Sequence, residues 1–394
     1  MYFGDATELC RSFIACSSAS SSPSDIVKAA FSRSSAFDDP NTYQSAALDW
    51  VESTSNGLSE ARILQRYALA CIYYATNDVP TTWSQEAKFS GPWFLDDGWL
   101  SNSNECNWHG ISCNQSGYVE IIRLDKNGLT GSFPSEVTLL KASLLELDLT
   151  KNMFYNDDMA FLGELTNLQA LLLGYNAIVE KGLPLEWKQL TNLRSLDVSY
   201  CLFSGPIGDN FFASFPKLEY LDIGGNTFNG PVPDSIASLW ALKYLYMEFT
   251  GLQGTLDPIL KSNLPLIEEI WTDDNPGLSG GIAPEVGNLV SLKSLSLTNC
   301  NLSESIPDEM GRLVNMQQLW LSENNLEGVI PEEFGSLKSM KRFHLQSNNL
   351  VGSMPQAVCD NTKNGGYLKT LGVDCNVSCS SGCCTCCGDS CSNE

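Results

Sequence analysis

Residues 295–302 read LSLTNCNL, and residues 319–326 read LWLSENNL. Both follow the pattern L-x-L-x-x-N-x-L, which returns ten times from residue 119 onward. The position usually held by asparagine falls at 127, 152, 176, 201, 226, 250, 275, 300, 324 and 348, so every spacing is 24 or 25 residues. Chance does not hold such a register over so many intervals. Residues 119–358 are therefore predicted to form a stack of structural repeats.

A repeat of this length holds one short strand and a returning segment, and it cannot bury its apolar side alone. Stacked repeats bury a continuous core, and their strands form a parallel sheet along one side. Because side chains alternate along a strand, Leu147, Leu149 and their equivalents are expected to point into the core. The predicted fold class is α/β: a curved, right-handed solenoid of about ten repeats of 24–25 residues.

The asparagine column has a structural task in this scheme. A side-chain amide can satisfy backbone groups in the turn that leaves the strand, where no neighbouring strand supplies partners. Thr250, Cys201 and Cys300 replace asparagine with other small side chains. We therefore interpret Cys201 and Cys300 as parts of the repeat rather than as redox or metal-binding groups.

A second motif follows most strands, as in GPVPDSI (230–236) and GVIPEEF (328–334). Gly and Pro mark a turn, and the acidic residue after Pro suits the start of a short helical turn. Joined to the strand, the motif reads L-x-x-L-x-x-L-x-L-x-x-N-x-L-x-G-x-I-P. This resembles the repeat of plant-type leucine-rich-repeat proteins, which include receptor-kinase ectodomains and polygalacturonase-inhibiting proteins.

The block before the first repeat extends the resemblance. Residues 99–113, WLSNSNECNWHGISC, resemble the N-terminal cap of these proteins, with Cys106, Trp108, Gly110 and Cys113 in the expected places. The resemblance covers about residues 95–375 and implies a Cys-containing cap at 96–118. The sequence departs from the receptors in showing no membrane helix and no kinase, and from the inhibitors in its N-terminal region and cysteine tail.

The region before the cap has a different character. Residues 1–24 are predicted to be a flexible Ser-rich segment, and residues 25–95 a helical region that packs on the open end of the solenoid. Helices are expected at about 25–33, capped by Ser24, and at about 42–53. Such a block ahead of a W-x-G-I-x-C cap is similar to algal surface leucine-rich-repeat proteins of the diatom type.

The third predicted helix, at 59–77, has the clearest pattern. Ser59 is its cap candidate, and apolar side chains recur at helical spacing. We expect this face to shield the first strand of the solenoid; it consists of Ile63, Leu64, Tyr67, Cys71 and Tyr74.

Fifteen cysteines favour an oxidising compartment, where disulfides staple the ends of a fold. Residues 359–394 are predicted to be a Cys-rich C-terminal cap and tail, in which Cys359 pairs with Cys375 or Cys379. The alternative is a thiolate cluster for zinc or copper(I) in the tail. The disulfide candidates are Cys106, Cys113, Cys359, Cys375 and Cys379.

Three N-x-S sequons, at Asn114, Asn301 and Asn376, also fit an extracellular or cell-surface location and make these residues glycosylation candidates. The first residues, MYFGDATELC, do not form a convincing signal peptide, because Asp5 and Glu8 stand where positive charge is expected.

Charge and missing motifs exclude several functions. The net charge of −23 repels phosphate backbones and anionic lipid, so neither nucleic acid nor a membrane is an expected partner. The two histidines, His109 and His344, show no nucleophile motif such as G-x-S-x-G, and no phosphate-binding or H-E-x-x-H motif is present. We expect no enzyme activity, no cofactor and no metal site.

The outward side chains of the strands are the candidate ligand-binding site. Aromatic and acidic residues gather there, which favours docking of a partner through aromatic anchors and attraction of Lys or Arg. The alternative is that the rings simply stack along the sheet. The candidate residues are Tyr175, Asp197, Tyr200, Tyr220, Asp222, Tyr244, Tyr246, Glu248, Phe249, Glu269, Trp271, Asp273, Asp274 and Trp320.

Three functions remain open at this point. The first is a non-catalytic recognition module that binds a protein or peptide, with a basic ligand favoured, on the concave face. The second is carbohydrate or cell-wall binding, including glycosidase inhibition in the manner of the polygalacturonase inhibitors. The third is a structural or metal-binding role led by the cysteine tail.

Overall fold

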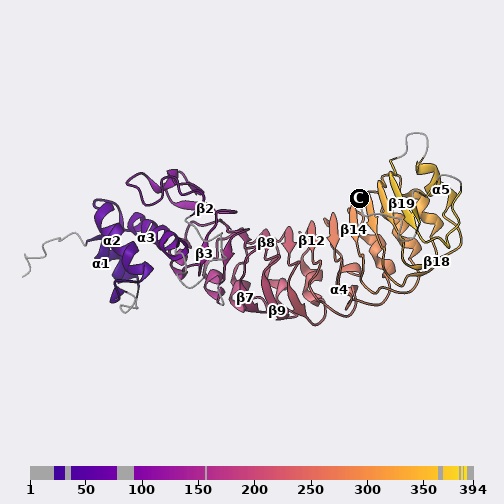
Figure 1. Cartoon of the computed structure of the whole chain (residues 1–394), viewed down its shortest axis with the longest axis horizontal. Coiled ribbons are helices and arrows are strands. Elements are labelled where there is room, and N and C mark those ends of the chain that lie inside the picture. The colour runs from indigo at the N-terminus through magenta and orange to yellow at the C-terminus, as the bar shows by residue number, and fades with distance from the viewer. Residues whose placement is uncertain are drawn as a thin grey trace, which may run out of the picture.

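The computed structural model describes residues 22–31, 37–77, 93–155, 158–362, 367–380, 383–384 and 386–387. Figure 1 shows an elongated solenoid with a helical block at one end and a small cap at the other. The strands line the inner side of its curve. Most of the expected Ser-rich segment (residues 1–24) lies outside the described residues. The first residues, which we compared with a signal peptide, lie outside them too. No helix in the described part of the chain is long and apolar enough to cross a membrane.

One sheet of thirteen described strands runs the length of the solenoid, and all its neighbouring pairs are parallel except β1 with β2. The ten predicted repeats supply ten of these strands, so the repeat prediction is confirmed. The strands in spatial order are β1 (Ile111–Cys113), β2 (Val119–Arg123), β4 (Glu146–Asp148), β6 (Ala170–Leu172), β8 (Ser195–Asp197), β10 (Tyr220–Asp222), β12 (Tyr244–Tyr246), β13 (Glu269–Trp271), β14 (Ser294–Ser296), β15 (Gln318–Trp320), β17 (Arg342–His344), β19 (Thr370–Val373) and β20 (Cys386–Cys387).

β19 is an eleventh repeat strand beyond the predicted end of the solenoid at residue 358. Leu371 and Val373 are buried in the core as Leu147 and Leu149 are. The sequence pattern missed it because the equivalent asparagine, Asn376, follows Asn348 by 28 residues instead of 24 or 25.

The returning segments form short 3-10 turns and small outer sheets. Pro stands at the N-cap of several turns, as the Gly-Pro motif predicts. The turns and helices are η3 (Ser135–Leu140), η4 (Ala160–Glu164), η5 (Leu185–Gln189), η6 (Phe212–Ser214), η7 (Asp234–Ser238), α4 (Asp257–Leu260), η8 (Pro284–Asn288), η9 (Asp308–Arg312) and η10 (Glu332–Ser336). The outer strands are β3 (Thr130–Gly131) with β5 (Met153–Phe154), β7 (Val179–Lys181) with β9 (Leu202–Pro206) and β11 (Thr227–Asn229), and β16 (Glu327–Val329) with β18 (Asn349–Val351).

The asparagine column performs the predicted task. The Asn152 amide donates to the carbonyl oxygens of Leu124 and Leu149 at 2.8 and 2.9 Å, and its Oδ1 accepts from the backbone N–H groups of Asn127 and Leu129 at 3.0 Å. These bonds join each repeat to the preceding one. The cysteine replacements act likewise: the buried thiol of Cys201 donates to a backbone carbonyl oxygen.

Three helices cover the first repeats: α1 (Pro23–Ala30), α2 (Tyr43–Thr54) and α3 (Glu60–Thr76). α1 is capped by Ser22, not by Ser24, because Ser22 and Asp25 form a reciprocal capping box. Ser59 holds the N-cap position of α3, but its side chain makes no capping bond.

The face of α3 that we expected to shield the solenoid instead packs mainly within the helical block. Ile63, Tyr67 and Cys71 are buried against side chains of α1 and α2. The adjacent face, with Leu69 and Ile72, joins the solenoid core. The prediction chose the wrong face because both faces of α3 are apolar, and helical spacing alone does not rank them.

A buried ion pair ties the helices to the cap. Glu105, in η2 (Glu105–Asn107), accepts from Arg62 at 2.7 Å and Arg66 at 3.2 Å, and its side chain is fully buried. Gln65 accepts the backbone N–H of Val119 at 2.8 Å. The helices thereby satisfy polar groups at the end of the sheet where no further repeat exists.

Disulfides close both ends of the solenoid. Cys106 pairs with Cys113 in the N-terminal cap. Next to α5 (Gln356–Cys359) and η11 (Asp360–Thr362), Cys359 pairs with Cys383, so our pairing of Cys359 with Cys375 or Cys379 is wrong. Chain spacing did not reveal that β19 places residue 383 beside α5.

Other cysteines of the tail also form disulfides. Cys379 pairs with Cys384, and Cys375 is also disulfide-bonded. The described tail cysteines thus favour disulfides over the thiolate cluster, while Cys391 lies outside the described residues. Of the three sequons, Asn301 and Asn376 are exposed, and Asn114 is half-buried, its side chain accepting from Ser116 and Tyr118.

Candidate functional site

The inner face is the surface formed by the outward side chains of the strands and of the turns that leave them. In each three-residue strand the central side chain enters the core, and its two neighbours point outward. The strands pair without offset, so equivalent residues of successive repeats form straight columns. One column runs through Asp197, Asp222, Tyr246, Trp271, Ser296, Trp320 and His344.

All fourteen predicted ligand-binding residues lie on the inner face, in four such columns. The column at the strand starts holds Tyr220, Tyr244 and Glu269, and the column at the strand ends holds Asp197, Asp222, Tyr246, Trp271 and Trp320. Two residues past the strand ends lie Glu248 and Asp273. One residue further lie Tyr175, Tyr200, Phe249 and Asp274, all with a left-handed backbone.

The left-handed position shapes the site. Tyr175, Tyr200, Phe249 and Asp274 have φ between 47° and 59°. For a residue with a Cβ this conformation costs about 1 kcal/mol or more. The next residue in each turn, which is Asn176, Cys201, Thr250 or Asn275, is held by side-chain hydrogen bonds, so large rings can occupy a backbone position that usually favours glycine.

The aromatic rings contact one another along the sheet. Tyr246 meets Trp271 edge to face, with ring centroids 5.3 Å apart, and Trp271 meets Trp320 at 6.3 Å. Tyr175 and Tyr200 stack with their centroids 4.5 Å apart. The ladder that we considered as an alternative is therefore present, but the stacked tyrosines remain 46% and 40% exposed, so they can still receive a ligand.

Carboxylates lie between these rings, partly sunk into the sheet. A Cβ at Gly174 would lie 2.5 Å from Oδ1 of Asp197, and a Cβ at Gly224 would lie 3.1 Å from the carboxyl carbon of Glu248. A side chain at either glycine would therefore crowd the carboxylate of the next repeat. Oε2 of Glu248 is buried and accepts no hydrogen bond within the described structure.

Burial and mutual repulsion raise the pKa values of these inner-face carboxylates. Desolvation, and then the charge of Asp197, raise the pKa of Asp222 to about 7. Desolvation is also the main cause that raises the pKa values of Asp197, Glu248 and Asp273. The protein therefore holds several carboxylates where their negative charge is poorly compensated.

The edge of the sheet is different, because its acids are paired within the chain. Glu219 accepts from Lys243 at 2.7 Å and also pairs with Arg194, and Glu268 accepts from Lys293 at 2.7 Å. In the described structure no salt bridge engages Asp197, Asp222, Glu248, Asp273 or Asp274. Arg194, Lys243 and Lys293 thus neutralise acids at the edge, whereas these five inner-face carboxylates have no ion-pair partner among the described residues.

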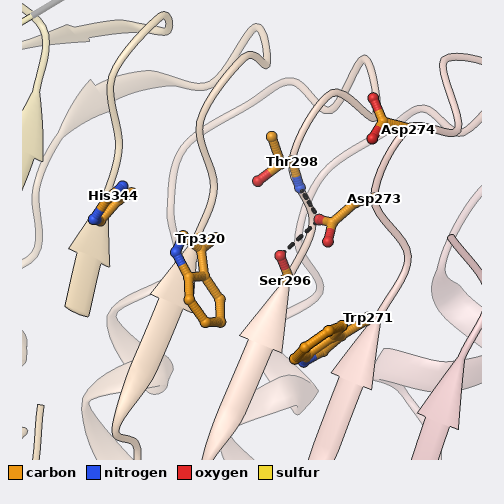
Figure 2. Close-up of a pocket in the computed structure, with 7 residues that line it drawn as sticks. All are labelled: Trp271, Asp273, Asp274, Ser296, Thr298, Trp320 and His344. Atoms are coloured by element: carbon orange, nitrogen blue, oxygen red, sulfur yellow. Dashed lines mark hydrogen bonds between the residues drawn. The ribbon is translucent and has the colours of Figure 1, made fainter. Parts of the chain in front are cut away.

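A hollow of about 330 Å³ opens on the inner face between two tryptophans. Ser296 lies between Trp271 and Trp320 in the column, and its small side chain leaves the space. Figure 2 shows both indoles beside this gap, with Asp273 and Thr298 along one side. The residues that line the hollow are Trp271, Asp273, Asp274, Ser296, Thr298, Trp320 and His344.

His344 forms the far wall of the hollow and was not among the predicted ligand-binding residues. Its side chain is 3% exposed, and its Nε2 lies 3.0 Å from the Thr370 hydroxyl. Burial, and then the charge of Arg342, lower its pKa, so the ring is neutral at neutral pH. Alignment of the repeats could have found it, because His344 occupies the same column as Trp320.

The described residues contain no group of three or more His, Cys, Asp or Glu side chains that could hold a metal ion. The inner face instead offers aromatic faces, hydroxyls and carboxylate oxygens. These groups bind cations and polar rings, and they do so on an open sheet rather than in a deep enclosed site.

Comparison with known proteins also points to leucine-rich repeats. Leucine-rich-repeat models match residues 290–350, 192–213 and 217–239. Among curated proteins, the chain is 31% identical to the receptor protein-tyrosine kinase CEPR1 of Arabidopsis thaliana over 39% of this chain and 16% of that protein. The chain thus corresponds to about one sixth of that relative's length.

Two solved ectodomains have the same architecture at 28% identity and a TM-score of 0.63. One is the ectodomain of the Arabidopsis thaliana receptor kinase GASSHO1/SCHENGEN3 in complex with CASPARIAN STRIP INTEGRITY FACTOR 2; the match covers 69% of this chain and 32% of that one. The other is the Arabidopsis receptor kinase HAESA with the peptide hormone IDA and the co-receptor SERK1, at 71% and 46%. Repeats, fold and relatives agree that the chain carries leucine-rich repeats of the plant type.

Proposed function

We propose that the chain is a non-catalytic recognition module whose inner face binds a basic protein or peptide segment outside the cytoplasm. The observation that carries the proposal is the contrast in charge pairing. Edge acids such as Glu219 and Glu268 form salt bridges within the chain, whereas no salt bridge of the described residues engages the carboxylates between the aromatic rings. A cationic ligand would supply the missing partners.

The stacked tyrosines support this ligand class. Lys151 already lies over the ring of Tyr175, with its ammonium nitrogen 5.1 Å from the ring centroid. A tyrosine face attracts a cation through its ring quadrupole, and the interaction strengthens where water is excluded. The same surface can therefore receive Lys or Arg side chains from a ligand.

The partners of similar proteins support a peptide or protein ligand. HAESA was solved with a peptide hormone and a co-receptor, and the GASSHO1/SCHENGEN3 ectodomain belongs to a plant membrane receptor kinase. The disulfides at both ends fit an oxidising compartment.

Carbohydrate binding is the second candidate. The hollow between Trp271 and Trp320 offers indole faces beside hydroxyl and carboxylate oxygens, a combination that also suits a sugar ring. Salt separates the two candidates, because charge-driven binding weakens steeply with ionic strength, whereas stacking on a sugar changes little.

The test is a peptide and glycan array probed with the wild type and with a Tyr246→Ala, Trp271→Ala double variant. Trp240→Ala is the matched control, because Trp240 is 65% exposed on the edge of the solenoid. We expect salt-sensitive binding to basic peptides that the double variant loses and the control keeps. Salt-insensitive glycan binding would replace the proposal with the second candidate, and equal binding by the double variant would move the site off the inner face.

A further inference from the structure

We infer that the hollow between Trp271 and Trp320 is a subsite for the guanidinium group of an arginine side chain in the ligand. The inference rests on the proposed function and sharpens it: among basic ligands, the site would select those that present arginine rather than lysine. Four features of the hollow carry the argument.

The first feature is its shape. Trp271 and Trp320 are two strands apart in the same column, and the small Ser296 lies between them. Their rings meet edge to face, with centroids 6.3 Å apart and planes at 79°, so a flat group would lie on the ring faces that line the hollow rather than enter between the two rings (Figure 2). A planar guanidinium stacks on an aromatic face, whereas an ammonium is a compact, strongly hydrated charge.

The second feature is the pair of carboxylates at the rim. Oδ1 of Asp273 accepts from the Ser296 hydroxyl and the Thr298 backbone N–H, both at 2.7 Å. Oδ1 of Asp274 accepts from Asn299 at 2.8 Å. These bonds fix both carboxylates, and no salt bridge of the described structure engages either of them. An arginine fork can donate to two carboxylate oxygens at once.

The third feature is the absence of a competing cation in the hollow. Its seven lining residues include two carboxylates and no Lys or Arg. Because His344 is neutral at neutral pH, it does not repel an incoming cation. A ligand carboxylate or phosphate would meet only negative charge there.

The fourth feature is an unsatisfied polar atom in the far wall. Nδ1 of His344, a residue that lines the hollow, is buried and has no hydrogen-bond partner among the described residues. Buried polar atoms are normally satisfied by protein, water or ligand. The far wall thus holds polar hydrogen-bonding capacity that the described residues leave unused.

The experiment compares three peptides by isothermal titration calorimetry: octa-arginine, octa-lysine and octa-citrulline. Citrulline keeps the shape of arginine but carries no charge. Each is titrated into the wild type, Trp320→Ala, Asp274→Asn and the control Trp240→Ala. Asn tolerates the left-handed backbone at 274, so that variant keeps the turn.

We expect octa-arginine to bind about tenfold more tightly than octa-lysine, a difference within the range of cation–π and bidentate contacts. Trp320→Ala and Asp274→Asn should each weaken octa-arginine about tenfold and octa-lysine less than about threefold. Octa-citrulline should not bind measurably, and Trp240→Ala should leave all three peptides unchanged.

Equal affinity for octa-arginine and octa-lysine, unaffected by Trp320→Ala and Asp274→Asn, would overturn the arginine subsite while leaving basic-peptide recognition in place. Binding of octa-citrulline as tight as that of octa-arginine would overturn it too, because the site would then recognise the shape of the side chain and not its charge. Absence of binding by both cationic peptides would overturn the subsite and the proposed function together.

Discussion

Tyr175 and Tyr200 stack nearly parallel, with ring centroids 4.5 Å apart and planes at 15°, yet both rings remain close to half exposed. They come from adjacent repeats and occupy the same left-handed backbone position. The Tyr200 ring lies over Gly225, where a Cβ would approach ring carbons at 2.5 Å. Three repeats thus build an open aromatic platform beside the carboxylates of Asp197 and Asp222.

Replacing Tyr200 by alanine should weaken binding to basic peptides more than it weakens the fold. The stacking of the two rings contributes about 0.5–1.5 kcal/mol to stability beyond the area that they bury. We expect urea unfolding to change by about 1 kcal/mol and the affinity for octa-lysine to fall about fivefold. The control is Tyr367→Ala, which removes another exposed tyrosine. A loss of stability of several kcal/mol without loss of affinity would make the platform purely structural.

Binding of basic peptides should strengthen as pH rises through 7. The pKa of Asp222 is raised to about 7 by desolvation first and by Asp197 second, so this carboxyl loses its proton across that range and gains the charge that attracts a cation. Calorimetric titrations with octa-lysine at several pH values check this. In Asp222→Asn the dependence between pH 6 and 8 should flatten, and an unchanged pH profile in that variant would contradict the assignment.

The same carboxyl should lower the stability of the free protein as pH rises. Its folded pKa lies above the unfolded value near 3.9, so the folded state binds more protons between these limits and the contribution of Asp222 to stability is lost as pH rises through about 7. Thermal unfolding should show a smaller decline from pH 5 to 8 in Asp222→Asn than in the wild type. A steeper decline in the variant would reverse the sign and refute this account.

Replacing Asn152 by alanine should destabilise the solenoid by about 2–4 kcal/mol, because it leaves several buried backbone groups of two repeats without partners. Asn349→Ala is the matched control, since Asn349 is exposed in β18 and its replacement should cost less than about 0.5 kcal/mol. Urea unfolding followed by circular dichroism measures both. Equal effects of the two substitutions would show that the asparagine column does not join the repeats.

Peptide mapping of the oxidised protein should recover Cys359 linked to Cys383, and Cys379 linked to Cys384. Mass spectrometry with and without reduction identifies the linked peptides. Cys359→Ser should lower stability by about 2–4 kcal/mol, because it opens a loop that holds the last repeat strand. Recovery of Cys359 linked to Cys375 would instead restore the pairing that the sequence favoured.

The repeat architecture was predictable because one periodic pattern specifies both the core and the outward columns. Once Leu147 and Leu149 are assigned to the core, the side chains on either side must form the inner face, and all fourteen candidate residues lie there. Prediction failed where the period changes. β19 was missed because its asparagine is displaced, and the Cys359 partner was missed because that strand was missed.

Packing between neighbouring side chains also could not be predicted from the sequence. The hollow depends on Ser296 being small between Trp271 and Trp320, and the far wall depends on burial of His344. Neither residue is unusual when its own repeat is read alone. The pairing of edge acids with Arg194, Lys243 and Lys293 likewise required side-chain positions, and this pairing is what distinguishes the edge from the inner face.

The most direct test of the central claim compares two variants that each lose four carboxylates, measured at pH 8, where Asp222 is largely ionised. One carries Asp197→Asn, Asp222→Asn, Asp273→Asn and Asp274→Asn on the inner face, and the other carries Asp308→Asn, Glu327→Gln, Glu332→Gln and Glu333→Gln at exposed positions in the returning segments. The measurement is the affinity for octa-lysine by calorimetry at low salt. We predict a loss of about thirtyfold or more for the inner-face variant and less than about threefold for the other. Equal losses would show that only net charge attracts the peptide, and would contradict recognition by the inner face.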